Sequence, residues 1–220
     1  MFKHLTTLFI ALAFITTAQN SFNYKKDFNT ILAKTKDPKD KLNYDKLLTR
    51  FKTNDTTLTN AEVLALLIGF TVKPEYKPYT HLKEEKAVYD LNAEGKYDEG
   101  LVKANEFLAT HPFSVKVIFE RSFSYYKARM TDSAKIFASQ GYKIFNAMKY
   151  SGDGKTKQTA MFALGPEDGE DYIYKFLGSG TGQKGNIPDD DGHKLNFYEV
   201  VSKVEEPYTL YFNVQHAEKK

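Results

Sequence analysis

The chain has 220 residues, a formal net charge of +3, 41% hydrophobic residues and no cysteine. This length and apolar content suit one compact unit, and the lack of cysteine excludes disulfides, thiol catalysis and a cysteine-borne lipid anchor. Acidic and basic residues are interspersed along the chain, so the charge pattern favours neither nucleic acid nor an anionic membrane as a partner.

Residues 1–18 have the order of a secretory signal peptide. Lys3 precedes the apolar run Leu5 to Ile15, and the small residues Thr16-Thr17-Ala18 follow. We expect cleavage before Gln19, which would place the mature protein in the periplasm or outside the cell. A retained anchor is the alternative, but the run is shorter than the ~20 residues that span a bilayer, so no membrane insertion is predicted after cleavage.

Residues 19–150 are predicted to be helical. A first helix around Phe28 and Ile31 should end near Asp37-Pro38, because proline disfavours helical geometry in the residue before it. Apolar spacing over Tyr44–Phe51 predicts a second helix.

The strongest helix start is Thr59-Asn60-Ala61-Glu62, a capping box in front of the apolar run Val63 to Phe70. We expect that helix to be the most buried. The two prolines in Lys73–Tyr79 predict an extended linker, in which Tyr76 and Tyr79 either make a surface contact or pack over a helix groove.

Residues 81–148 carry a repetitive helical pattern. Helices are predicted after Gly95, over Val115–Tyr126 and from Thr131, and small residues on their faces allow close approach of neighbouring helices. These small residues are Ala104, Ser122, Ala134, Ala138 and Gly141.

The spacing in this region resembles the tetratricopeptide repeat, which has a period of ~34 residues. Gly95, Tyr97, Ala104, Phe107 and Pro112 fall near the glycine, aromatic, small, packing and closing-proline positions of that repeat. The match departs from the pattern at Gly100, where alanine is usual, and at Val88, where a small residue is expected. No third unit is evident. The resemblance implies paired helical hairpins with a concave groove for a peptide or protein partner.

Residues 151–220 are predicted to form an antiparallel β region. Strands are expected over 159–164, 172–177, 195–201 and 208–214, with a turn at 165–169. The predicted fold class is therefore α+β: an N-terminal helical part with tetratricopeptide-like hairpins packed on a small C-terminal antiparallel sheet, as one compact unit.

Two glycine-rich segments invite a phosphate-binding interpretation. Gly152–Thr156 lacks the first glycine of a Walker loop, whose place Lys149 takes, and a strand follows it, so a helix-to-strand turn is the better interpretation. Gly180–Gly185 matches G-x-G-x-x-G, but Pro188 follows where a helix would be needed, which favours a flexible loop between strands.

Other motifs are equally incomplete. Asp189-Asp190-Asp191-Gly192 has contiguous rather than alternating carboxylates, which favours a solvated acidic turn over a calcium loop. The histidines His81, His111, His193 and His216 have no metal-ligand spacing. Ser151, Asp153 and His193 lack the sequence frame of a catalytic triad. No catalytic, cofactor-binding or metal-binding residue is predicted.

Several segments together resemble a family of exported Bacteroidota proteins known only as domain of unknown function 4919. The resemblance implies export and origin, and it brings no activity. The segments are Tyr44–Phe51, Leu66–Phe70, Tyr76–Tyr79, Ser151–Gly154 and Tyr211–Asn213.

The leading functional expectation is a non-catalytic exported protein that binds a peptide or protein through its helical hairpins. One alternative is a small-ligand-binding protein or hydrolase that uses loop carboxylates, and it requires two of Asp153, Asp168 and Asp189–Asp191 to converge. A second alternative is a structural subunit of an envelope assembly, which an exposed apolar patch would favour.

Overall fold

The computed structural model describes residues 22–218 of the chain. The predicted signal peptide and its cleavage before Gln19 lie outside these residues. The first two thirds of the described chain are helical, as predicted. The helices are α1 (Tyr24–Lys36), α2 (Tyr44–Lys52), α3 (Asn60–Phe70), α4 (Leu82–Ala93), α5 (Tyr97–Thr110), α6 (Val115–Lys127) and α7 (Thr131–Ser151).

The remainder forms a small sheet with short helical segments. These elements are β1 (Met161–Phe162), α8 (Asp168–Asp171), the π-helix η1 (Tyr172–Phe176), β2 (Gly180–Pro188), β3 (Lys194–Val201), β4 (Tyr208–Asn213) and the 3-10 helix η2 (Gln215–Ala217). The strand order is β1-β4-β3-β2. The prediction of a purely antiparallel sheet was wrong in one respect, because β1 pairs with β4 in parallel and makes the sheet mixed.

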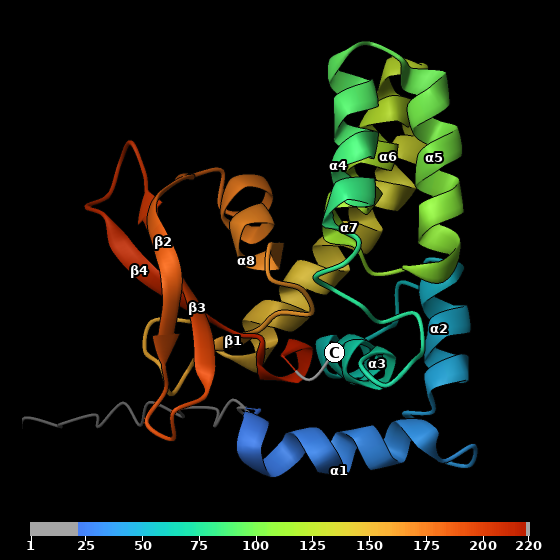
Figure 1. The fold of residues 1–220 in the computed structure, drawn as a ribbon. Helices are drawn as coiled ribbons and strands as arrows, with labels where there is room; N and C mark the ends of the chain where they lie inside the picture. The colour runs from blue at the N-terminus through green and yellow to red at the C-terminus, as the bar shows by residue number, and fades with distance from the viewer. Residues whose placement is uncertain (1–21, 219–220) are drawn as a thin grey trace, which may run out of the picture.

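Figure 1 shows the layers of this α+β fold. Helices α4 to α7 stand as a bundle, and α1 lies across the end of the molecule near α3. The sheet occupies the other side, and α8 lies between the sheet and the bundle. Since α7 runs from the bundle to β1, it is the element that joins the helical part to the sheet.

The predicted capping box is confirmed at α3. The backbone amide of Glu62 donates to the Thr59 hydroxyl at 3.2 Å, and the Thr59 amide donates to the Glu62 carboxylate at 2.9 Å. All residues from Val63 to Phe70 are buried, which is the burial that the apolar run predicts. Helix α3 is thus the centre of the helical core, in contact with α1, α2 and α7.

Close helix approach is confirmed at Gly141 in α7. A Cβ atom at this position would lie 2.5 Å from Cε2 of Phe119 in α6. The ring of Phe119 therefore fills the space that any larger residue would need, and it stacks on Phe145 with 5.4 Å between ring centroids. The α6–α7 packing depends on this glycine.

Three local predictions were wrong. Where a strand was predicted over 172–177, residues Tyr172–Phe176 form a π-helix, and the consecutive residues Tyr172 and Ile173 are both buried rather than alternating between two faces. Gly180–Gly185 belongs to strand β2 rather than to a loop, since pairing with β3 supplies the order that the glycines lack. The linker contains turns, and Tyr76 is buried with its hydroxyl donating to the Leu164 carbonyl at 2.6 Å, whereas Tyr79 is 40% exposed.

The two ends of the described chain meet in an aromatic cluster around His216. The His216 ring stacks on Phe162 with 4.5 Å between centroids and also faces Phe28, Tyr24 and Tyr76. Tyr24 and Phe28 come from α1, and His216 comes from η2. The last described residues thereby hold the first helix against the core.

Candidate functional site

A groove runs along the face of the helical bundle that is turned towards α8. It consists of two adjoining hollows of about 660 and 670 Å³ that share Tyr89, Glu120 and Lys175, and we call it the inner groove. Volumes of this size are typical of ligand-binding clefts. The charged half is lined by Leu82, Lys83, Lys86, Tyr89, Lys116, Glu120, Glu167, Glu170, Asp171, Tyr174 and Lys175. The apolar half is lined by Tyr89, Phe119, Glu120, Ser122, Phe123, Tyr126, Thr131, Ala134, Lys135, Ala138 and Lys175.

A buried polar network fixes the floor of the charged half. Asn92 of α4 donates to the backbone carbonyl of Glu120 at 2.9 Å and to its carboxylate at 3.0 Å. The Ser124 hydroxyl donates to the Asn92 side-chain oxygen at 2.6 Å. Since fully bonded buried polar groups hold one geometry, this network locks α4 to α6 and points the Glu120 carboxylate into the inner groove.

The π-helix forms the opposite wall of the groove. Its wide turn is closed by the Leu177 amide, which donates to the Tyr172 carbonyl at 3.2 Å. Tyr174 is left half exposed in the groove, and Lys175 reaches across to Glu120 at 3.3 Å. Segments of π-helix occur often at functional sites, because the extra residue in the turn redirects side chains.

The apolar half exposes aromatic rings. Tyr89 is 52% exposed, Phe123 is 40% and Tyr126 is 62%. Aromatic side chains offer large contact areas at low entropic cost and are enriched at protein interfaces. Their exposure shows that the C-terminal strands leave this part of the hairpin face uncovered.

A second, smaller cavity of about 50 Å³ lies beside the groove, and we call it the small acid pocket. Glu85 of α4 and Asp168 of α8 line it together with His81, His111 and Ser114. Burial raises the pKa of Glu85 to about 7. Burial also raises the pKa of Asp168 to about 8, and the nearby charge of Glu85 adds to that rise. Two carboxyl groups from distant segments thus share one pocket, and both hold their protons more tightly than usual.

The Asp168 carboxylate also has a structural role, since it accepts a hydrogen bond from the Gly165 amide at 2.8 Å. A raised pKa means that the folded state binds a proton more tightly than the unfolded chain, so stability falls as pH rises from about 4 towards 8. Asp168→Asn keeps the acceptor oxygen and has no proton to lose. As pH rises across this range, we expect the free energy of unfolding of Asp168→Asn to increase relative to that of the wild type by up to about 1.4 kcal/mol per pH unit.

Denaturant unfolding at several pH values measures this difference in the free energy of unfolding, and Asp153→Asn is the matched control. The Thr159 hydroxyl holds the pKa of Asp153 below its usual value, so its stabilising contribution is present above the unfolded pKa and is lost in acid. The control should therefore lose stability at neutral pH. Parallel pH curves for Asp168→Asn and the wild type would contradict the raised pKa.

The hydrolase alternative required carboxylates of different loops to converge, and these loops lie at separate cavities. Asp153 lines a cavity beside β4, Asp189 and Asp190 line another beside α1, and Asp168 lines the small acid pocket. Asp168 instead meets Glu85, which the sequence analysis did not single out.

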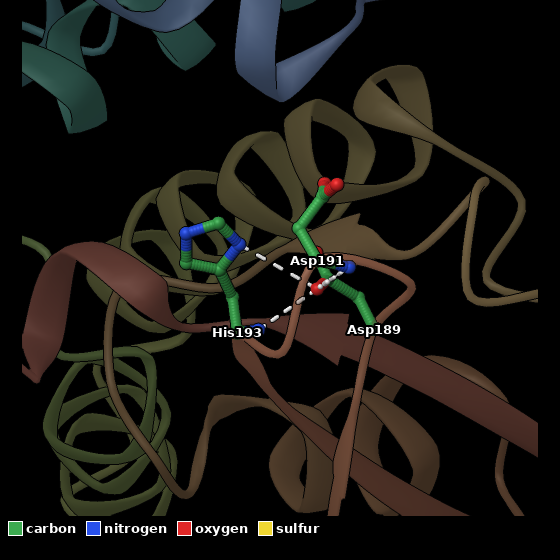
Figure 2. A group of neighbouring side chains, drawn as sticks. All are labelled: Asp189, Asp191 and His193. Atoms are coloured by element: carbon green, nitrogen blue, oxygen red, sulfur yellow. Dashed lines mark hydrogen bonds and ion pairs between the residues drawn. The ribbon is translucent and has the colours of Figure 1, made fainter.

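Asp189, Asp191 and His193 form the only described group with ligand atoms close enough to hold a metal ion. Figure 2 shows that Asp189 is occupied in closing the turn: its carboxylate accepts from the amides of Asp191 at 2.9 Å and His193 at 2.8 Å. Its other oxygen accepts from Gln215 at 3.1 Å, and Asp191 pairs with Lys25. With these carboxylates already bonded to protein groups, the arrangement fits the predicted acidic turn.

The remaining sequence candidates have structural roles. The Ser151 hydroxyl donates to the Met148 carbonyl at 2.6 Å and accepts from the Phe162 amide at 2.7 Å, so it is engaged in ending α7 and does not join His193. Gly154 has a φ of +70° in the predicted helix-to-strand turn. The backbone amide of His111 donates to the Phe107 carbonyl at 3.0 Å at the end of α5.

Sequence reasoning missed most of the inner groove. Glu120, Lys175 and Asn92 are polar residues without a motif, and they meet only because α8 and η1 fold back towards α4 and α6. Part of the apolar half was predictable, because Phe119, Ser122 and Tyr126 have the spacing of one helical face.

The fold and the groove define an α+β protein with an open cleft on a helical bundle. The chain belongs to the family described as domain of unknown function DUF4919, which matches residues 29–220. No curated protein and no solved structure matches the chain.

Within residues 22–218, no helix combines the length and the apolar character needed to span a bilayer.

Proposed function

We propose that the protein is a non-catalytic binding protein that takes a peptide or protein segment into the inner groove. The observation that carries this proposal is the row of exposed aromatic rings at Tyr89, Phe123 and Tyr126 beside a charged floor fixed by hydrogen bonds. Rigid aromatic anchors beside oriented polar groups are typical of recognition sites. The resemblance of residues 81–148 to tetratricopeptide repeats adds support by analogy of fold.

Site-specific photo-cross-linking tests the proposal. A benzophenone amino acid replaces Tyr126 in the groove of the full chain expressed in its host, and the control places it at Val102, an exposed residue of α5 outside the groove. We expect a discrete adduct from position 126 that is absent from position 102 and that is lost when Phe123 is changed to alanine. The same adducts from both positions would contradict binding in the groove.

We further propose that the protein works outside the cytoplasm, as the signal-peptide pattern of residues 1–18 and the family resemblance indicate. Fractionation of the host cells, followed by N-terminal sequencing, tests this proposal. Gln19 as the first residue of an exported form would support it, and an uncleaved cytoplasmic chain would contradict it.

A second candidate function is binding or hydrolysis of a small polar ligand in the small acid pocket. The paired carboxyl groups of Glu85 and Asp168, with pKa values of about 7 and 8, favour it because such values suit general acid–base chemistry near neutral pH. A panel of chromogenic esters and glycosides, assayed with the wild type and Glu85→Gln, tests the hydrolase. Activity lost in the variant would support it, and no turnover of any substrate would count against it.

A further inference from the structure

The carboxylates that line the charged half of the inner groove lie beside lysines. Glu120 pairs with Lys175 at 3.3 Å, Glu170 pairs with Lys184 at 2.8 Å, and Glu167 pairs with Lys116. The fourth carboxylate, Asp171, lies 4.0 Å from Lys175. Each carboxylate that lines the groove therefore has a lysine beside it, and Glu120 and Asp171 share Lys175.

The lysines of the lining are not balanced in the same way. Lys86 pairs with Asp90 on its own helix at 2.6 Å. Across the described residues 22–218, Lys83 and Lys135 form no ion pair with a carboxylate, and both are exposed. The groove thus keeps two free positive charges.

These two charges lie on opposite sides of the shared residues. Lys83, in the first turn of α4, lines only the charged half. Lys135, near the start of α7, lines only the apolar half. Tyr89 belongs to both halves and lies between them. A segment laid along the groove would meet one cation, then the aromatic rings, then the second cation.

We infer that the occupant is a peptide segment with aromatic or aliphatic side chains flanked by acidic residues, its carboxylates pairing with Lys83 and Lys135. This inference rests on the proposed function, since it names the chemistry of the segment that the groove takes. A segment with basic flanks would meet uncompensated positive charge at both ends, and like-charge contact selects against such partners.

Fluorescence anisotropy with two labelled synthetic peptides tests the inference on the full chain. Both peptides have phenylalanine and tyrosine at the centre, and they differ only in carrying glutamates or lysines at the ends. We expect the glutamate peptide to bind the wild type more tightly. Since exposed ion pairs contribute modestly, the double variant Lys83→Glu/Lys135→Glu should bind the glutamate peptide about tenfold more weakly and favour the lysine peptide instead.

The control is Lys155→Glu/Lys203→Glu, which makes the same change in net charge at exposed lysines outside the groove and should leave the preference unchanged. Equal binding of the two peptides to the wild type, no binding of the glutamate peptide, or equal weakening by the control would each overturn the inference.

Failure of the inference is distinguishable from failure of the proposed function. If Phe123→Ala/Tyr126→Ala weakens both peptides equally while charge reversal has no effect, the groove binds peptides but the acidic preference is wrong. If the aromatic double variant also leaves the binding of both peptides unchanged, peptide binding in the groove is itself contradicted.

Discussion

His216→Ala is expected to lower the free energy of unfolding by about 3 kcal/mol, because it removes a buried ring and leaves a cavity. The His216 ring is packed against Phe162, Phe28, Tyr24 and Tyr76 and is only 7% exposed. Loss of the ring separates α1 from the end of the chain. Urea unfolding measures the change, and His216→Phe is the matched variant that keeps an aromatic ring in the stack.

The same pair of variants tests the protonation state of this residue. Burial lowers the pKa of His216 to about 3 from 6.5, and among the described residues its Nε2 atom has no hydrogen-bond partner. The unfolded chain therefore binds a proton more readily than the folded one. The stability that the neutral ring contributes is fully present above pH 6.5 and is lost as pH falls from 6.5 towards 3.

His216→Phe has no proton to bind at this position. We expect it to match the wild type near pH 7 and to become relatively more stable below pH 6.5, by up to about 1.4 kcal/mol per pH unit. A wild type whose acid destabilisation equals that of His216→Phe would show that His216 titrates normally in the folded protein.

Gly141→Leu is expected to destabilise the protein by about 1–3 kcal/mol through overpacking. The new side chain must displace Phe119, which a Cβ atom alone would approach to 2.5 Å. Asn146→Leu is the matched control, since it puts the same side chain on the exposed face of α7 and should change stability little. Thermal unfolding of the two variants gives the comparison.

Gly141→Leu should also affect the groove, because Phe119 lines its apolar half. We therefore expect weaker binding of both test peptides at temperatures where the variant is still folded. Unchanged stability would show that α6 and α7 can separate without cost, which the stacked rings of Phe119 and Phe145 argue against.

Most of the helical part could be predicted from the sequence, because its signals are local. The Thr59–Glu62 capping box and the apolar run after it define α3 without reference to the rest of the fold. The sheet was less predictable. Strand β2 has three glycines and no alternation of apolar residues, so its order comes from pairing with β3, which no local pattern encodes. At Tyr172–Phe176, residue types that favour strands adopt a π-helix because tertiary packing overrides propensity.

The candidate sites were harder still to predict. Glu85 and Asp168 lie in different parts of the chain, and the pocket that raises their pKa values exists only when α8 packs near α4. Of the rings that line the groove, helical spacing places Phe119 and Tyr126 on one face, whereas Tyr89 and Phe123 were not predicted to lie there. The pairing of the groove carboxylates with lysines depends on side-chain positions that follow from the whole fold.

The aromatic cluster also bears on the order of folding. The ring of His216 in η2 packs on α1 and lies 192 residues after Tyr24 in the sequence, so the inner face of α1 is covered only when η2 has folded onto it. Contacts between such distant segments form late and slow the folding reaction. A chain that lacks residues 215–220 keeps β4 and loses η2, and it is therefore expected to keep α3 protected from hydrogen exchange while the amides of α1 exchange rapidly.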